Sequence, residues 1–259
     1  MFYIDQFVYT NKMRNSHPGE RLAFALATMF ISVTVNQPVV HLTVVAIMVG
    51  FLAFRAKIPG YVILKLFSVP VTSLLVGVMT IAVQINRFET GMLFSMNVGS
   101  YYLGVTKASA AVAVVTLLKS LSAVSCLYFF VLTTPMIEVI YTLKLLRAPA
   151  VFLDLMMLVY RFIFIFVETA FQIYTSQSSR WGYLGFRRSI HSFGLLFANL
   201  WAKSFIKSQA IFTSLLSRGY EGELNVVTPA YNWSSSNLLL FGFIDLGLIL
   251  MALYSGVVM

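Results

Sequence analysis

The sequence predicts an all-α integral membrane protein with about five transmembrane helices and a cytoplasmic region of long amphipathic helices. The chain of 259 residues is 59% hydrophobic and only 10% charged, whereas soluble domains are about a quarter charged. Its mean hydropathy is +0.85, and several apolar runs reach the ~20 residues that a spanning helix needs. The 18 Lys and Arg outnumber the 9 Asp and Glu and lie mostly between the apolar runs, as the positive-inside rule expects.

Four spans are expected in the first half of the chain. The apolar stretch 22–54 is too long for one span, and Asn36-Gln37-Pro38 divides it in two because proline cannot continue a helix. A third span is expected at about 61–85 and a fourth at about 105–132. The fourth is rich in Ala and Ser, which let membrane helices pack closely. A polar, glycine-bearing loop at 86–104 is expected to join the third span to the fourth.

The region 134–235 differs from the spans and is predicted to be cytoplasmic. Thr134-Pro135 is a helix start signal, and Ala148-Pro149 ends the short helix that follows. A long helix then changes from apolar to polar as it approaches Ser179. The next helix, about 189–217, has apolar residues at the spacing of one buried stripe. The positions of this stripe are 190, 193, 197, 200, 201, 205, 208 (a serine), 211, 212 and 215.

These patterns divide the chain into a membrane bundle of four spans (1–133), the cytoplasmic region (134–235) and a final span (236–259). With the N-terminus in the cytoplasm, nearly all Lys and Arg outside the spans lie on the cytoplasmic side. The outer loop then holds only Arg87 before the fourth span opens near Lys107. The opposite orientation would invert this bias, so a cytoplasmic N-terminus is predicted.

Signatures of catalysis, metal binding and nucleic-acid binding are missing from the sequence. It contains no G-x-x-x-x-G-K-[ST], so ATP binding through a P-loop is not expected. Its three histidines are far apart, and Cys126 is its only cysteine, which excludes a thiolate metal cluster. No basic block is interleaved with exposed polar sequence, as nucleic-acid binding would need. We therefore expect no catalytic residue, no metal ligand and no cofactor bound by this chain.

Two predicted helices end in a serine, an arginine and a glycine that follows within two residues. They end as Ser179-Arg180-Trp181-Gly182 and Ser217-Arg218-Gly219. Glycine adopts the left-handed conformation that commonly ends helices, and a small residue lets another backbone approach. Arginine presents a planar fork of donors suited to a carboxylate on a partner. Alternatively, the arginines only complement the helix dipole and the glycines only stop the helices.

Charges also occur within apolar sequence. Asp154, Arg161 and Glu168 are spaced by seven and so share one face of the long helix. A charge in apolar surroundings is costly unless it is paired or faces a cavity. A structural ion network that ties this helix to the spans is the simpler interpretation. Lys119 and Asp245 lie within predicted spans, where they could pair with each other or line a cavity.

Three stretches of the sequence carry a resemblance to a known family. They are the opening from Ile4-Asp5 to Arg14 with His17-Pro18-Gly-Glu-Arg21, the core from Lys119 through Thr134-Pro135 and Leu146-Arg147-Ala148-Pro149 to Tyr160-Arg161, and the two Ser-Arg helix ends. Through them, nearly the whole chain resembles the transmembrane T component of energy-coupling-factor transporters, of the CbiQ type that serves cobalt uptake. Serine replaces alanine in both of the family's Ala-Arg-Gly-type motifs. Trp181 replaces the glycine of the first, which suggests that Arg180 holds this motif more than a tight turn does.

The resemblance implies a non-catalytic subunit of an ATP-driven importer in a bacterial or archaeal inner (plasma) membrane. Its implied partners are two cytoplasmic ATP-binding subunits and a membrane substrate-binding subunit that carries the metal site, besides the lipid bilayer. Grooves on the ATPases would hold the two helix ends, and acidic groups there would meet the arginines. Closure of the ATPases would then rotate or topple the substrate-binding subunit. The implied ATPase-coupling residues are Ser179, Arg180, Ser217, Arg218 and Gly219.

Other functions remain open at this level. The same role could serve nickel or a vitamin, since specificity would lie in another subunit. A substrate-binding or channel subunit would need convergent ligands near a span or an N-terminal His motif. An intramembrane enzyme would need a catalytic pair on the spans, and Lys119 and Asp245 are the only candidates for one.

Overall fold

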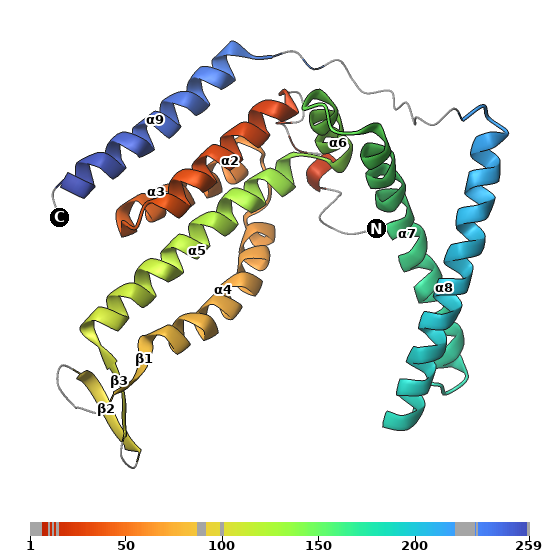
Figure 1. The fold of residues 1–259 in the computed structure, drawn as a ribbon, viewed down its shortest axis with the longest axis horizontal. Coiled ribbons are helices and arrows are strands. Elements are labelled where there is room, and N and C mark those ends of the chain that lie inside the picture. The colour runs from red at the N-terminus through yellow and green to blue at the C-terminus, as the bar shows by residue number, and fades with distance from the viewer. Residues whose placement is uncertain are drawn as a thin grey trace. The chain divides into compact units, whose positions relative to one another are not determined.

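The computed structural model of the chain describes residues 7–9, 11, 13, 16–86, 92–98, 101–220, 231 and 233–257. The described chain is mostly helical, which confirms the predicted all-α class (Figure 1). It forms two compact units, which we call the bundle unit (2–135 with 230–259) and the hairpin unit (136–229). The predicted opening motif at 4–14 and the predicted outer loop with Arg87 lie partly outside the described residues.

The bundle unit is built around one long central helix. Its helices are α2 (Pro18–Thr34), α3 (Pro38–Gly50), the π-helical turn η2 (Phe51–Arg55) that continues α3, α4 (Gly60–Ala82), α5 (Lys107–Thr133) and α9 (Ser235–Val257). The central helix α5 contacts α2, α3 and α4, and α9 lies along α2 (Figure 1). The predicted break at Asn36-Gln37-Pro38 is confirmed, because α2 ends at Thr34 and α3 begins at Pro38.

Five described helical segments are long and apolar enough to cross a membrane: Pro38–Arg55, Gly60–Ala82, Lys107–Thr133, Ala150–Ser179 and Ser235–Tyr254. This number agrees with the prediction, but the set differs. The predicted first span corresponds to α2, which has only 17 residues. The long helix at 150–179, which we assigned to the cytoplasmic region, is apolar enough to span. The names membrane bundle and cytoplasmic region therefore stay predictions.

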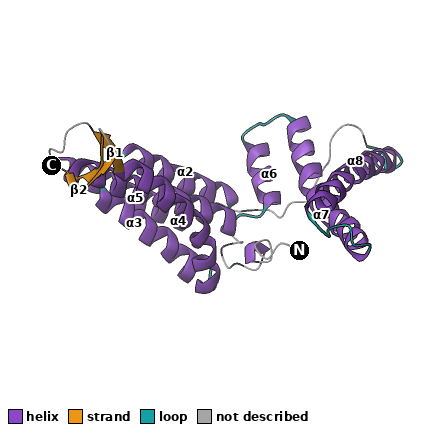
Figure 2. Cartoon of the chain, turned by 90° about the horizontal axis from the view of Figure 1, so that it is seen from below, coloured by secondary structure: helices purple, strands orange, loops and turns teal. Residues whose placement is uncertain are grey.

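The expected polar loop at 86–104 is wrong in part, because a small sheet occupies much of it. The strands β1 (Val83–Asn86), β2 (Met92–Val98) and β3 (Tyr101–Thr106) pair antiparallel in the order β1-β3-β2 (Figure 2). Val83 pairs with Val105, and a bulge interrupts the pairing of β2 beside Met92. β-Branched and aromatic residues between the polar ones favour strands here.

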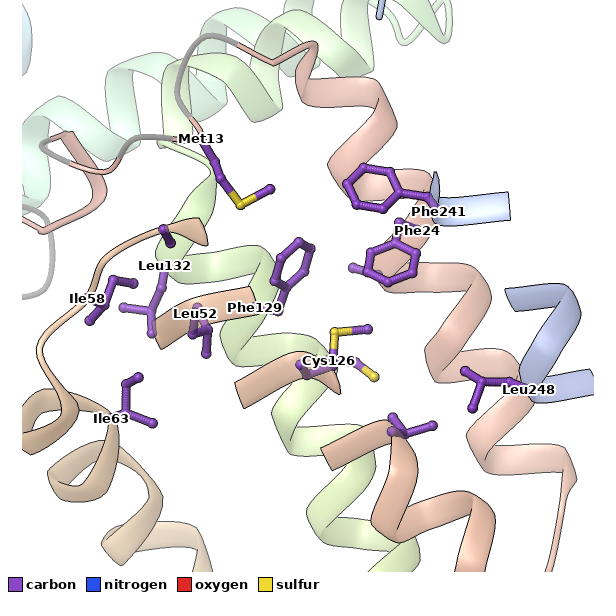
Figure 3. Packing of buried hydrophobic residues seen from close by; sticks show 14 of the residues in the cluster. Met13, Phe24, Leu52, Ile58, Ile63, Cys126, Phe129, Leu132, Phe241 and Leu248 are labelled. Carbon is purple, nitrogen blue, oxygen red and sulfur yellow. The ribbon is translucent and has the colours of Figure 1, made fainter. Parts of the chain in front are cut away.

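Aromatic side chains from three helices form the centre of the bundle unit (Figure 3). The ring of Phe24 on α2 stacks on Phe241 of α9, with centroids 4.4 Å apart. It also meets Phe129 of α5 edge to face at 5.6 Å. The free thiol of Cys126 is buried one turn along α5. By contrast, Leu64 on α4 is largely exposed, as a lipid-facing side chain would be.

A buried polar group also joins three helices of the bundle unit. The hydroxyls of Ser32 on α2 and Ser122 on α5 are hydrogen-bonded, and each lies 3.4 Å from Nδ1 of His41 on α3. Near this group, Lys119 Nζ donates to Oδ1 of Asn36 at 3.0 Å. The structure therefore gives Lys119 a partner in the α2–α3 turn, which neither of the two alternatives left open for it had named.

Pro70 lies inside α4 and leaves one carbonyl of the helix without its usual donor. A proline has no N–H to give to the residue four positions earlier, which is Leu66. The hydroxyl of Tyr128 on α5 donates to the Leu66 carbonyl at 3.0 Å. Its ring also meets Phe67 edge to face at 5.2 Å. Tyr128 thus replaces the missing backbone bond and joins α4 to α5.

We expect Tyr128→Phe to lower the free energy of unfolding by about 1 kcal/mol, because the Leu66 carbonyl then lacks a donor. Thermal unfolding of the purified chain in detergent measures this change. Pro70→Ala restores a backbone donor for the same carbonyl, so the cost of Tyr128→Phe should shrink in that background. An equal cost in both backgrounds would contradict the explanation.

His17 precedes α2 and caps its first turn. Its Nδ1 accepts the N–H of Gly19 at 3.1 Å, and its ring stacks on Trp233 at 4.0 Å between centroids. Burial lowers the pKa of His17 below its ordinary 6.5; Glu20 opposes this shift and Arg21 adds to it. The folded chain therefore favours the neutral ring.

The pH dependence of stability follows from this lowered pKa. The stabilisation of the folded chain by the neutral His17 ring is fully present above about pH 6.5. It is lost as the pH falls from there toward the lowered pKa that His17 has in the folded chain. His17→Asn keeps a capping side chain but removes the titration. We expect the melting temperature of the wild type, relative to this variant, to fall on mild acidification. A constant difference between the two proteins would refute the assignment.

Candidate functional site

The hairpin unit presents helix ends that share one backbone geometry. It contains α6 (Met136–Leu145), α7 (Ala150–Ser179) and α8 (Phe186–Leu216), and α7 contacts both other helices (Figure 1). Figure 1 shows α7 and α8 as two long helices that cross each other. The predicted Ser-Arg motifs lie at the C-terminal ends of α7 and α8.

The end of α7 is a tight turn closed by two backbone bonds. The N–H of Trp181 donates to Ser178 at 3.0 Å, and that of Gly182 donates to Gln177 at 2.9 Å. This is a Schellman motif, whose left-handed residue is usually glycine. Here Trp181 takes that conformation, with φ 57°. The expectation that Arg180 rather than a tight turn holds this motif was wrong, because these bonds close the turn despite the cost of the tryptophan.

Gly182 allows this turn to close. A Cβ there would lie 2.8 Å from the Gln177 carbonyl oxygen and 2.9 Å from Oγ of Ser192 on α8. Ser192 Oγ donates to the Gly182 carbonyl at 2.7 Å, and Gln177 Nε2 donates to the Ser192 carbonyl at 3.1 Å. The Tyr183 hydroxyl donates to Gln177 Oε1 at 2.7 Å. The α7–α8 turn is therefore cross-linked by side chains.

The end of α8 repeats the same pattern of backbone bonds. The N–H of Gly219 donates to Leu216 and that of Tyr220 donates to Leu215, both at 3.1 Å. Gly219 takes the left-handed conformation, with φ 76°, as glycine is expected to do. A Cβ on Gly219 would meet open space, so its backbone angle rather than crowding favours glycine there.

Because the two turns match, Arg180 and Arg218 stand at equivalent positions, each directly before the left-handed residue. Both side chains are exposed. The hydroxyls of Ser179 and Ser217 donate at 2.9 Å to carbonyls of their own helices. Within the described residues neither guanidinium is engaged in a hydrogen bond or ion pair, so both are available to a partner.

A third helix end of this kind was not predicted from the sequence. At the end of α6 the N–H of Arg147 donates to Lys144 at 3.0 Å and that of Ala148 donates to Leu143 at 3.1 Å. Arg147 itself takes the left-handed conformation, with φ 61°. The Ala148-Pro149 break was recognised, but the arginine before it is not preceded by a small residue.

The turn at the end of α7 also opens onto a basic hollow of about 790 Å³. Arg180, Arg187, Arg188 and His191 line it, and no Asp or Glu does. Arg187 and Arg188 lie in the first turn of α8, where the helix dipole disfavours cations. Helix stability therefore does not explain them. In the sequence both contribute only to the predicted charge bias, although two arginines at a helix start were a usable signal.

The three spaced charges of α7 do not meet. Asp154 is buried, and its Oδ2 accepts the hydroxyl of Tyr220 at 3.4 Å, whereas Arg161 and Glu168 are exposed. No ion pair joins these three side chains to one another within the described residues, and the predicted network that ties this helix to the spans stays a prediction. Burial raises the pKa of Tyr220, and the charge of Asp154 raises it further. The contact holds the end of α8 near the start of α7.

The apolar stripe predicted to be buried on α8 is mostly exposed in the hairpin unit. The buried positions of α8 are Ser192 and Leu196, whereas Phe193, Phe197 and Trp201 are exposed, the last by 80%. Helical spacing shows that apolar residues share a face, but it does not show what covers that face. The prediction of a buried stripe was therefore wrong for most of its positions.

Comparison with known proteins now defines the family. The sequence model described as "Cobalt transport protein", CbiQ, matches residues 10–229. The chain belongs to the CbiQ family. With its apolar helices, it is a multi-pass membrane component of this cobalt transport family. The expected resemblance to CbiQ proteins is thereby confirmed.

Three relatives of this CbiQ-family chain are informative. An uncharacterized protein of Methanocaldococcus jannaschii is 29% identical over 96% of this chain and 92% of its own length. A fused cobalt transport protein CbiMQ of Methanocorpusculum labreanum is 29% identical over 85% of this chain and 36% of its own length. The cobalt transport protein CbiQ of Salmonella typhimurium is 26% identical over 86% of this chain and 99% of its own length. None of these three is named as an enzyme.

We expect Gly182→Ala to destabilise the hairpin unit by about 1–3 kcal/mol, because the added methyl group would collide with backbone and Ser192. Gly194→Ala is the matched control on α8, since nothing lies within 4 Å of a Cβ there and alanine favours a helix. Thermal unfolding of both variants in detergent tests the difference. A Gly182→Ala variant as stable as Gly194→Ala would rule out the close approach.

Proposed function

We propose that this chain is the coupling (T) component of an energy-coupling-factor importer for cobalt. It would transmit the ATP-driven closure of two cytoplasmic ATP-binding subunits to a membrane substrate-binding subunit. The observation that carries this proposal is the matched geometry of two helix ends, which present Arg180 and Arg218 at equivalent positions as exposed side chains.

Matched ends suit a partner that occurs twice. Two copies of one kind of ATPase offer two similar grooves, and equal backbone turns place both arginines alike relative to their helices. A guanidinium binds a carboxylate through two parallel hydrogen bonds, which fixes direction as well as position. The helices behind the ends have 30 and 31 residues, or about 45 Å of rod. Such rods carry a displacement without bending much.

The two ends are not equal in charge. The α7 end adds Arg187, Arg188 and His191 around the basic hollow, whereas at the α8 end the neighbouring Tyr220 is bonded to Asp154. The groove that receives Arg180 should therefore carry more acidic groups than the groove that receives Arg218. In this proposal residues 134–235 lie on the cytoplasmic side, and the chain itself binds neither ATP nor the metal.

The exposed aromatic stripe of α8 suits the membrane subunit. Phe193, Phe197 and Trp201 form an apolar face that the hairpin unit itself leaves uncovered. A large exposed apolar patch marks an interaction surface. The fused relative, in which a chain of this kind is joined to a second cobalt transport part, supports such a neighbour.

We expect Arg180→Glu together with Arg218→Glu to abolish co-purification with the ATP-binding subunits, because each new carboxylate would repel an acidic groove. Affinity purification of the co-expressed transporter, followed by quantification of the ATPase, measures this. Lys203→Glu with Lys207→Glu is the control, because it makes the same charge change on α8 away from both ends. An intact complex and normal cobalt uptake in the Arg180 and Arg218 double variant would overturn the proposal.

A further inference from the structure

The chain passes between the bundle unit and the hairpin unit at two places, near residues 135 and 230. On the bundle side, side chains at or just before the start of α2 hold the chain close to both places. We call Asn11, His17, Glu20 and Arg21 the root clamp. All four are buried.

The first crossing follows the end of α5. Because α5 ends at Thr133, the carbonyls of its last turn lack helical donors. A guanidinium nitrogen of Arg21 donates to the Thr133 carbonyl. Nδ2 of Asn11 lies 3.2 Å from the carbonyl oxygens of both Leu132 and Thr133. Asn11 and Arg21 thus cap α5 at the point where the chain leaves the bundle unit.

The second crossing precedes α9. Oε1 of Glu20 accepts the N–H of Ser234 at 2.7 Å, directly before the first residue of α9. The ring of His17 stacks on Trp233, the residue before that. Glu20 and His17 therefore hold the returning chain where it enters the bundle unit.

The charges of the clamp match the helix ends that they hold. A helix C-terminus carries partial negative charge and an N-terminus partial positive charge. Arg21 meets the C-terminus of α5, and Glu20 meets the N-terminus of α9. Arg21 is 0% and Glu20 is 3% exposed, and burying charges is costly unless they are compensated. Two adjacent residues of opposite charge thus contact the chain at the two connections, and Arg21 also donates to the Ser16 carbonyl at 3.1 Å.

We propose that Glu20 and Arg21 are positioning residues of the transport cycle, an inference that rests on the proposed coupling function. They hold to α2 the bundle-unit ends of both connections, at 132–133 and 233–234, so that displacement of the arginine-tipped helices would move the bundle unit. Loosening either connection would let ATP hydrolysis proceed without moving the metal.

The test uses the assembled transporter reconstituted in vesicles, with Co²⁺ as the probe. Each of three variants removes a contact at one of the two connections: Glu20→Ala at the start of α9, and Arg21→Gln and the uncharged Asn11→Ala at the end of α5. We expect ATP hydrolysis to be retained in each, while Co²⁺ moved per ATP falls by about tenfold, a typical size for coupling between sites. A merely structural role would lower both activities in the same proportion.

Two variants serve as controls. Glu20→Gln keeps an acceptor oxygen for the Ser234 N–H and should retain most of the coupling. Ser122→Ala loses a buried hydrogen bond elsewhere in the bundle unit, so it should lower the melting temperature without changing Co²⁺ moved per ATP.

Three results would overturn the inference: a proportional fall of hydrolysis and uptake in the clamp variants, equal uncoupling in Ser122→Ala, or failure of all three clamp variants to assemble, which would show a role in folding alone. These results are separate from failure of the proposed function, which appears as an intact ATPase complex in the Arg180 and Arg218 double variant.

Discussion

The constraint on which this structure depends is that backbone N–H and carbonyl groups shielded from water need a partner within the protein. Helix interiors meet it by themselves, and helix ends and interruptions do not. At each such place a particular side chain or backbone turn supplies the missing hydrogen-bond partner. Tyr128 supplies the donor that Pro70 removes from α4. Arg21 caps α5, and backbone turns at Trp181 and Gly219 close α7 and α8.

The same devices produce the surfaces that the proposed function needs. A Schellman turn folds the chain back within two residues, so the side chain directly before it stands free at the tip of the helix. The turns that end α7 and α8 therefore place Arg180 and Arg218 where a partner can reach them. The cross-links through Ser192 then make the α7 tip rigid, which suits a surface that must transmit force.

The sequence predicted features that depend on local chemistry. Pro38 marked the start of α3, and Gly219 marked the end of α8. Features that depend on distant or absent neighbours were not predictable. Trp181 adopts a left-handed backbone that its own preferences oppose, because Gly182 and α8 close the turn around it. The apolar stripe around Trp201 was predicted to be buried. Its helical period shows that the residues share a face, but not whether this chain, lipid or another subunit covers that face. The capping of Thr133 by Arg21 joins residues more than a hundred positions apart.

The adjacency of Glu20 and Arg21 has a geometric consequence. Neighbouring residues on an α-helix point about 100° apart, so one contact toward α9 and one toward α5 together fix the azimuth of α2 about its own axis. A turn of α2 by one residue would break both contacts at once. Exchanging the two residues would set each charge against a helix end of its own sign. The order of Glu20 before Arg21 in the sequence is therefore tied to the handedness with which α5, α2 and α9 are arranged.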